Sequence, residues 1–261
     1  MPLSEQALRI YRIERIPKFL ATLDAQGRPN VALITSLEPW NEDRVIFGDF
    51  LMWKTRENLL AQPKVASIAA TTGLSFTGFT GDFEGFHSGG EYTEHIKATS
   101  TFRYNPYNSI RGAGTITVCD GLPVRRISRA TVAADILCVK LRARTAASGG
   151  VAMGPVVAEK FDRISAFKVF AWVGADGYPV VVPVLSTFPA GQGHLAFKVS
   201  SYNERLKQLA DGTLVAVNVT TTDPISYQVK GTFEGFACGL GRVEITDVYS
   251  SSPPLAGQRI A

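Results

Sequence analysis

Cysteine is scarce in this 261-residue chain, and its three cysteines lie far apart. Cys119, Cys138 and Cys238 form no Cys-x-x-Cys pair. An odd number of distant thiols argues against a disulfide framework and against a cysteine-based zinc site. We therefore expect three small core residues in a protein of the cytoplasm.

Long apolar runs and long basic runs are missing as well. The first residues, MPLSEQALRIYRIERIP, alternate charged and apolar side chains, so they hold neither the core of a signal peptide nor a membrane span. The formal net charge is +4, but the longest basic run is the pair Arg125-Arg126. We expect neither membrane insertion nor nucleic-acid binding.

The motifs of several enzyme classes are absent. The sequence has no Gly-x-Ser-x-Gly, no Walker loop and no dinucleotide fingerprint after a strand, so a nucleophilic hydrolase is not indicated. His87, His95 and His194 have no ligand-like spacing. We assign no metal and expect imidazoles that are exposed or locally bonded.

A repeat with a constant offset runs through the chain. The tetrapeptide Phe-Glu-Gly-Phe at 83–86 recurs at 233–236, an offset of 150. The same offset superimposes the segments around Gly27 and Gly177, and it relates Phe47 to Phe197. Coincidence does not keep one spacing over such a length, so we infer two copies of one unit.

Each copy has the pattern of strands, one short helix and further strands. In the first copy FLATL and NVALITSL flank the turn-forming DAQGRP, and in the second FAWV and VVVPVL flank GADGYP. A strand and a short helix follow, TRENLLAQ and then YNERLKQLA, before more strands. Helices this short cannot connect parallel strands, so the pattern predicts antiparallel sheets that close into two barrels.

The two copies differ in length. We predict a first barrel over residues 1–146, a linker over 147–157 and a second barrel over 158–261. With 135–143 as the expected last strand of the first barrel, residues 87–134 form an insertion of about forty residues, rich in loops and with at most one helix near 91–102. An insertion of this size can cover a site or fill surface against the other barrel.

The stretch MWKTRENLLAQP places basic residues at the start of the first copy's helix. A helix N-terminus offers unpaired amide groups and the positive end of the dipole, which together bind phosphate. Thr55 is suited to cap this helix and to donate to a phosphate oxygen, while Lys54 adds a charge and Arg56 a fork of donors. Asn58 is neutral and leaves the end open, and Pro63 ends the helix early. The alternative is a capped helix with exposed basic residues.

The second copy lacks the Lys-Thr pair of this helix start. Its corresponding segment, Ser201-Tyr202-Asn203-Glu204, has the pattern of a capping box, in which Glu204 satisfies the amide groups of its own helix. A helix end closed by a carboxylate repels an anion. The sequence therefore predicts one phosphate site, in the first barrel.

The hairpin LATLDAQGRPNVALI, the element WKTRENLLAQPKVAS and the strand pair TGDFEGF resemble the pyridoxamine 5'-phosphate oxidase-like FMN-binding split-barrel family. The resemblance covers most of residues 15–86 and, more faintly, 165–249. It implies a mainly β fold with short helices, in which two tandem antiparallel split β-barrels form an intramolecular pseudo-dimer, because family members are homodimers with flavin at the subunit interface. A further homodimer of such chains stays open.

The resemblance also implies which residues hold FMN. Lys54 and Thr55 hold its phosphate, assisted by Asn58 or Arg56. The flavin ring and ribityl chain are lined by Thr35, Ser36, Phe50, Leu51, Met52 and Trp53, and Gln228 of the second barrel adds a flavin contact. For the aromatic residues of this set, filling the barrel core is the alternative role.

The resemblance is incomplete, and this limits the expected reaction. No tryptophan follows Trp172, so the Arg–Trp element with which vitamin oxidases of the family grip pyridoxine phosphate has no match. Pyridoxamine phosphate oxidation is therefore disfavoured. We predict an FMN flavoprotein that passes electrons or hydride between a donor such as a reduced nicotinamide and a small molecule, with no catalytic residue assigned. The alternatives are a non-catalytic FMN sensor or electron store and a haem-binding split barrel.

Overall fold

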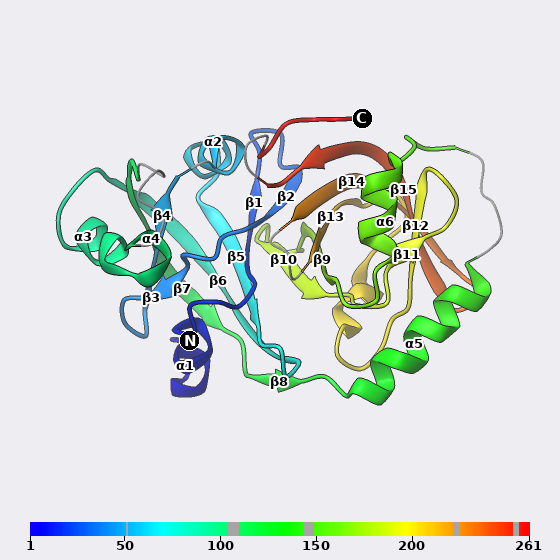
Figure 1. Ribbon diagram of the computed structural model, residues 1–261, viewed down its shortest axis with the longest axis horizontal. Helices are drawn as coiled ribbons and strands as arrows, with labels where there is room; N and C mark the ends of the chain where they lie inside the picture. Colours follow the sequence, from blue (N-terminus) through cyan, green and yellow to red (C-terminus); the bar gives the residue numbers. More distant parts are fainter. Residues whose placement is uncertain (51, 104–109, 144–148, 222–224, 253–255) are drawn as a thin grey trace. The chain divides into compact units, whose positions relative to one another are not determined.

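The computed structural model describes residues 1–50, 52–103, 110–143, 149–221, 225–252 and 256–261. The described chain is mainly β, with two antiparallel sheets and short helices (Figure 1), which confirms the predicted fold class. It forms two compact units. Unit 1 consists of Met1–Gly27, Leu33–Arg126 and Gly174–Pro179, and unit 2 of Arg28–Ala32, Ile127–Val173 and Val180–Ala261. Each unit thus includes a short piece of the other copy's first hairpin.

The first sheet has the strand order β2-β1-β5-β6-β7-β4-β3, and β8 pairs with β6. Its strands are β1 Lys18–Leu23, β2 Pro29–Leu33, β3 Glu38–Pro39, β4 Arg44–Asp49, β5 Lys64–Ala70, β6 Ser75–His87, β7 Gly112–Gly121 and β8 Arg125–Arg126. The helices in the same part of the chain are α1 Glu5–Tyr11, α2 Trp53–Ala61, α3 Glu91–Ala98 and α4 Ser100–Arg103.

The second sheet repeats this arrangement in the order β10-β9-β13-β14-β15-β12-β11. Its strands are β9 Phe167–Val173, β10 Pro179–Pro183, β11 Phe188–Pro189, β12 His194–Phe197, β13 Leu214–Thr220, β14 Ser226–Ala237 and β15 Leu240–Ser250. The accompanying helices are α5 Arg129–Arg142, α6 Pro155–Asp162 and the 3₁₀ helix η1 Glu204–Gln208. The two sheets therefore share one order of hydrogen-bonded neighbours.

The strand registers of the two sheets also agree residue by residue. Val65 pairs with Gly81 in the first sheet, and Val215 pairs with Gly231 in the second. The β6–β7 and β14–β15 pairs each contain two register shifts. At this glycine the extra residue lies on β7 or β15, and inside the Phe-Glu-Gly-Phe motif it lies on β6 or β14. A register and its bulges depend on local backbone geometry, so the constant offset extends from sequence to backbone.

The second bulge explains the Phe-Glu-Gly-Phe motif. In a regular strand, residues three apart point to opposite faces, but the bulge turns both phenylalanines of the motif toward the same ring. Phe83 and Phe86 lie 6.3 and 6.2 Å from Phe47, measured between ring centroids. The second copy repeats this triad with its own phenylalanines, and Gly235 has φ of +104°, a conformation that favours glycine.

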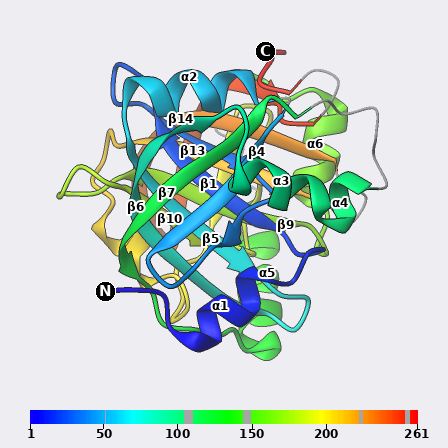
Figure 2. The same cartoon turned by 90° about the vertical axis from the view of Figure 1, so that its left-hand side faces the viewer.

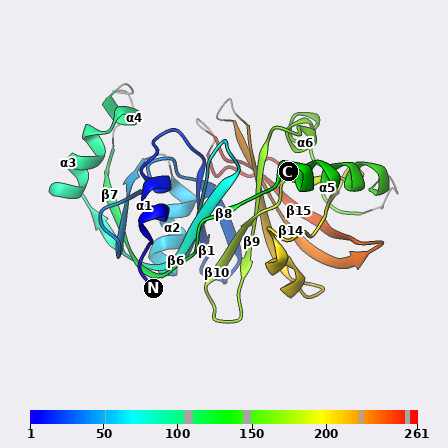
Figure 3. The ribbon, with the colours of Figure 1, turned by 90° about the horizontal axis from the view of Figure 1, so that it is seen from below.

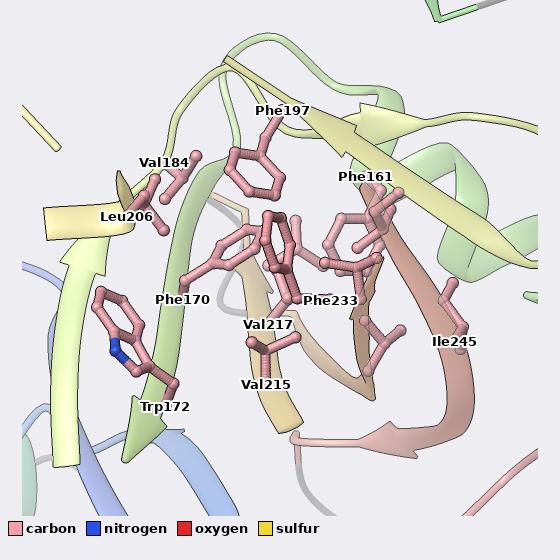
Figure 4. Close-up of a cluster of buried hydrophobic side chains, with 14 of the residues drawn as sticks. Phe161, Phe170, Trp172, Val184, Phe197, Leu206, Val215, Val217, Phe233 and Ile245 are labelled. Carbon is pink, nitrogen blue, oxygen red and sulfur yellow. The ribbon is translucent and has the colours of Figure 1, made fainter. Parts of the chain in front are cut away.

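The core of unit 2 receives side chains from strands far apart in the sheet order, from the end strand β10 and from β12, which is next to the other end. Val182 of β10 and Phe197 of β12 belong to one buried cluster with Val217 and Phe233 from the middle strands. Figure 4 shows the rings of Phe170, Phe197 and Phe233 turned toward one another. A flat sheet could not bring β10 and β12, five positions apart in the order, to one cluster, so this sheet is strongly coiled, as in a barrel.

Corresponding strands of the two sheets are covered by helices from different parts of the chain. In unit 1, Ile96 of α3 and Phe102 of α4 pack on Ile46 of β4 and on β7, where Figure 2 shows both helices. In unit 2, Ile136 and Val139 of α5 pack on Ala196, which stands 150 residues after Ile46, and Figure 3 shows α5 beside β15. The insertion of the first copy and the connecting helix of the second thus shield matching strands.

These elements correct the predicted end of the first barrel. Residues 135–143 were expected to form its last strand, but they lie in helix α5 and its C-terminal cap. The strand that corresponds to β15 is β7, which pairs Gly114 with Phe86 as β15 pairs Gly241 with Phe236. The insertion before this strand is therefore shorter than predicted, and it holds both α3 and α4 instead of at most one helix.

The compact units also divide the chain differently from the predicted barrels. Residues 127–143 cluster with unit 2, although they were assigned to a first barrel over 1–146. Residues 147 and 148 of the predicted linker lie outside the described residues, and α6 begins within its last part, at Pro155. The predicted ranges follow the repeat in the sequence, whereas the two units follow the compactness of the folded chain.

The cysteines are not core residues. Cys119 and Cys238 are exposed, Cys138 is half-buried, and all three are free thiols. The expected burial was wrong for Cys119 and Cys238, whereas Cys138 packs against the buried cluster of Ile136 and Val139. Within the described ranges, no helix combines the length and the apolar character needed to cross a membrane.

Candidate functional site

The helix with the basic first turn begins where the predicted phosphate site lies, but its cap is a different residue. Met52 is the N-cap (φ −121°, ψ 47°), and among the described residues no side chain caps the helix. Thr55, predicted as the cap, is the third residue of α2 and is only 4% exposed. No acidic residue stands in this first turn. The helix ends at Ala61, before Pro63, as predicted.

The buried face of α2 anchors the helix to the sheet. Thr55, Asn58 and Leu59 are buried and follow the three- and four-residue spacing of one helix face. The Asn58 side-chain amide donates to the Thr22 hydroxyl of β1 at 3.0 Å. Asn58 therefore fixes the helix on strand β1. Leu51, also predicted to line the site, lies outside the described residues.

A buried carboxylate holds two arginines beside α2. The Asp49 side chain, at the end of β4, is 2% exposed. Arg56 Nη1 donates to its Oδ2 at 2.5 Å, and Arg111 Nη2 donates to its Oδ1 at 2.8 Å. Two cations on one carboxylate leave a net positive charge, and the fixed geometry orders both guanidinium groups. Arg56 was predicted to assist at the phosphate, and in this structure it is paired with Asp49.

Each guanidinium also lies over an aromatic ring. Arg56 Cζ is 4.1 Å from the centroid of Phe86, and Arg111 Cζ is 4.2 Å from the centroid of Trp53. Both distances are within the range of a cation–π interaction. Trp53 is 61% exposed, and each arginine side chain is 33% exposed. The surface next to α2 therefore combines an open indole with ordered positive charge.

Sequence reasoning missed Asp49, Arg111 and Phe86. Asp49 and Arg111 are 62 residues apart, and no local pattern links them. They meet because β4 pairs with β7, so that the Arg111 amide donates to the Asp49 carbonyl at 2.9 Å.

The other residues of unit 1 that were predicted to line the flavin lie in two places. The Ser36 hydroxyl accepts from the amide of Gly48 at 3.0 Å, next to Asp49, and Thr35 precedes it; both residues are half-buried. Phe50 packs edge-on against Phe102, with ring centroids 4.8 Å apart, within the cluster under α3 and α4. Phe50 thus has the core-filling role that was the alternative for it.

Gln228 belongs to unit 2, where its side chain is fully engaged. It is 2% exposed, and its Oε1 accepts from the Val31 amide at 2.6 Å while its Nε2 donates to Asn30 Oδ1 at 3.0 Å. Asn218 Nδ2 donates to the Val31 carbonyl at 3.4 Å. In this structure the side chain predicted to contact flavin secures residues 28–32 of the first hairpin.

The matching loop of the second copy is built without a capping box. Asn203 is the N-cap, and Glu204 is the first residue of the five-residue helix η1. Asn203 Oδ1 accepts from the Ser200 amide at 2.6 Å, so Asn203 orders this loop, not Ser201. The Ser200 hydroxyl donates to Asp135 of α5, and burial raises the pKa of that carboxyl. Of these two helices only η1 has an acidic residue in its first turn, but the predicted closure of its start by Glu204 is wrong.

Two buried lysines occupy equivalent positions in the sheets. Lys18 is 2% exposed; burial lowers its pKa to about 8, opposed by the charges of Glu38 and Glu14. Lys168, 150 residues later, is completely buried, and its pKa falls to about 7 for the same first cause. Phe188 stands where the first copy has Glu38, so Lys168 Nζ lies 3.9 Å from a ring centroid and makes no hydrogen bond to any described residue.

Each histidine has a local partner. His87 Nε2 lies 3.1 Å from the Thr115 hydroxyl, His95 Nε2 lies 3.3 Å from Glu38, and His194 Nε2 lies 3.6 Å from Glu234. The histidines were predicted to be either exposed or locally bonded. His194 is buried, so only the second alternative describes it. Across the described ranges, no three His, Cys, Asp or Glu side chains converge as metal ligands would.

Comparisons with known proteins give partial similarities. No protein-family model matches the chain, and no curated protein matches it. Among solved structures, an FMN-binding protein from Syntrophomonas wolfei is 23% identical, covering 48% of this chain and 87% of that one, with a TM-score of 0.40. HupZ from Group A Streptococcus is 22% identical over 46% of this chain and 92% of its own, with a TM-score of 0.39. An F420 reductase is 15% identical over 46% and 98%, with a TM-score of 0.34.

Proposed function

We propose that this chain binds FMN, with the flavin's phosphate at the start of α2. The observation that carries the proposal is a helix start that has Lys54 and Thr55 in its first turn, no acidic residue there and, among the described residues, no side-chain cap. The backbone amides of such a turn and the helix dipole favour an anion. Asn58 keeps α2 on the sheet through Thr22, and Arg56 and Asp49 order the neighbouring surface.

The chain is, in this proposal, a tandem duplication of one split barrel, fused into a pseudo-dimer. Its support is the shared strand order, the shared registers and the matching bulges. Only the first copy keeps a phosphate site, because the residues at the positions of Lys54 and Thr55 in the second copy are Glu204 and Arg205. One FMN per chain follows. Association of two such chains would be a further step.

A bound FMN would supply the redox chemistry, and the protein's residues would bind, orient and shield it. In this proposal Trp53, Thr35 and Ser36 border the flavin next to α2. Oxidoreduction of a small molecule, with a reduced nicotinamide as donor, is the activity we assign. Anaerobic addition of NADH or NADPH to the FMN-loaded protein tests it, because bleaching of the visible flavin absorbance identifies an enzyme-like electron transfer. No bleaching by either donor would favour an electron store or sensor.

A phosphate-specific measurement tests the FMN site. Each charge-assisted hydrogen bond to phosphate contributes about 1.5–3 kcal/mol, or roughly tenfold or more in affinity. The double variant Lys54→Ala, Thr55→Ala should therefore bind FMN at least about a hundredfold more weakly. Its affinity for riboflavin, which lacks the phosphate, should change far less. Equilibrium dialysis with both flavins gives the two ratios.

The second copy offers a matched control for this measurement. The double variant Glu204→Ala, Arg205→Ala changes the residues at the equivalent positions. It should leave the affinities for FMN and riboflavin unchanged. A wild-type protein that binds neither flavin, or an equal loss in both double variants, would refute the proposed site.

A further inference from the structure

The cluster of Asp49, Arg111 and Trp53 is not required by the fold. At the offset of 150, Asp49 corresponds to Val199 and Trp53 to Asn203, and Arg111 belongs to the insertion that the second copy lacks. The second sheet nevertheless has the same strand order and the same register. A buried carboxylate with two cations is costly to place in a protein. Its presence in one copy alone points to a role in binding.

The charge of the cluster is incompletely compensated. Asp49 accepts one hydrogen bond from Arg56 and one from Arg111, through different oxygens. A guanidinium has five N–H donors. Each arginine uses one of them on Asp49 and has a third of its side chain exposed, so further donors can reach a ligand. Because Asp49 fixes their orientation, these donors are ordered before any ligand arrives, which lowers the entropic cost of binding.

Trp53 adds a planar surface to this charge. It is the first residue of α2 and is 61% exposed, an unusual position for a large aromatic side chain. The Arg111 guanidinium lies 4.2 Å from its ring centroid, so the indole is held in place without being buried. A flat ring can stack on the remaining indole surface while an acidic substituent on that ring accepts from Arg111.

We propose that Trp53 and Arg111 form a binding surface for a planar aromatic anion, an aromatic carboxylate being the simplest example. Arg56 supports it by sharing Asp49. The assignment of this ligand as the redox substrate rests on the proposed function, because the surface adjoins the FMN phosphate site on α2. The binding itself does not depend on flavin.

A matched pair of probes tests the surface. 2-Naphthoate and 2-naphthamide have the same ring, and only the first is an anion. Isothermal titration calorimetry on the full chain should show naphthoate binding about tenfold more tightly than naphthamide, the effect of one charge-assisted hydrogen bond. Arg111→Gln, which keeps a donor for Asp49, should remove this preference. Trp53→Ala should weaken both probes by a similar factor, because it removes the stacking surface.

Controls separate this surface from general charge and from the flavin site. Lys97→Gln removes an exposed positive charge on α3 and should leave both affinities unchanged. Trp53 is largely exposed, so Trp53→Ala stays informative even if Arg111→Gln unfolds, which circular dichroism would reveal. Equal binding of the two probes by the wild-type chain, or a naphthoate preference that survives in Arg111→Gln, overturns the proposal. Lys54→Ala with Thr55→Ala should lose FMN but keep naphthoate, so each site can fail independently.

Discussion

Lys168 gives unit 2 a pH-dependent stability that a single substitution removes. Lys168→Met keeps the aliphatic chain in the core and deletes the amine, which has no hydrogen-bond partner among the described residues. The charged groups that act on this amine are Asp162 of α6 and Lys140 of α5, and their effects oppose each other. Burial therefore decides the protonation state.

The magnitude follows from the lowered pKa. A lysine pKa of 10.5 in the unfolded chain and about 7 in the folded protein corresponds to about 5 kcal/mol between the two protonation states. Between these pH values the unfolded chain binds more protons than the folded chain, so wild-type stability rises with pH across this window. Below about pH 7 both states are protonated, and the full penalty applies. Lys168→Met should thus be most stabilising near pH 6, and this gain should shrink by about 5 kcal/mol toward pH 10.5.

Urea denaturation of both proteins at several pH values between 6 and 10 measures this difference. Trp172 is buried in the core of unit 2, so its fluorescence reports the unfolding of that unit when Trp40 and Trp53 are replaced by phenylalanine in both proteins. Subtracting the wild-type free energy of unfolding at each pH cancels the contributions of all other titrating groups. A difference that stays constant from pH 6 to 10 would mean that Lys168 does not change its charge on folding, and it would refute the reasoning.

The first copy contains the matched comparison for Lys168. Lys18 is buried at the equivalent position, but Glu38 and Glu14 favour its charged form, and its pKa is about 8. Lys18→Met should therefore show a smaller pH-dependent gain, about 3 kcal/mol, confined to the window between about pH 8 and 10.5. A larger effect at Lys18 than at Lys168 would contradict the role given to the carboxylates.

Two further predictions concern packing and the charged cluster. A Cβ on Gly114 would lie 2.2 Å from Cζ of Phe47, and one on Gly241 2.3 Å from Cζ of Phe197, so alanine at either glycine should cost about 1–3 kcal/mol in urea denaturation. Gly73→Ala, whose Cβ would meet only an ordinary contact at 3.6 Å, is the control, and an equal cost there would contradict the packing argument. Asp49→Ala leaves two guanidinium groups without their carboxylate and should lower the free energy of unfolding by about 3–5 kcal/mol. Unchanged stability would show that solvent compensates the two guanidinium groups when Asp49 is removed.

The repeat made much of the fold predictable from sequence. The offset of 150 and the short helices predicted antiparallel sheets. The structure contains them, and pairs such as Val65–Gly81 and Val215–Gly231 are related by the same offset. This succeeds because register depends on local features, such as turn glycines and the bulge of Phe-Glu-Gly-Phe, that are written in neighbouring residues.

The segment DILCVKLRA shows where local pattern was insufficient. Its apolar residues are compatible with a strand or with a helix face. Ser128 caps a helix by accepting from the Thr131 amide, and Ile136 and Val139, three residues apart, bury against β11, β12 and β15. The helix was decided by a sheet face that needed cover, which lies far along the chain.

The candidate site divides in the same way. Lys54 and Thr55 are neighbours in sequence, so their place in the first turn of a short helix could be predicted from the chain alone. Asp49 and Arg111 could not be connected, because their contact exists only after β4 and β7 pair. The sequence by itself determined the repeated strands and the basic helix start, since both depend on interactions between near neighbours. Tertiary structure alone decided which charges meet, because burial and strand pairing bring together residues that are 62 positions apart.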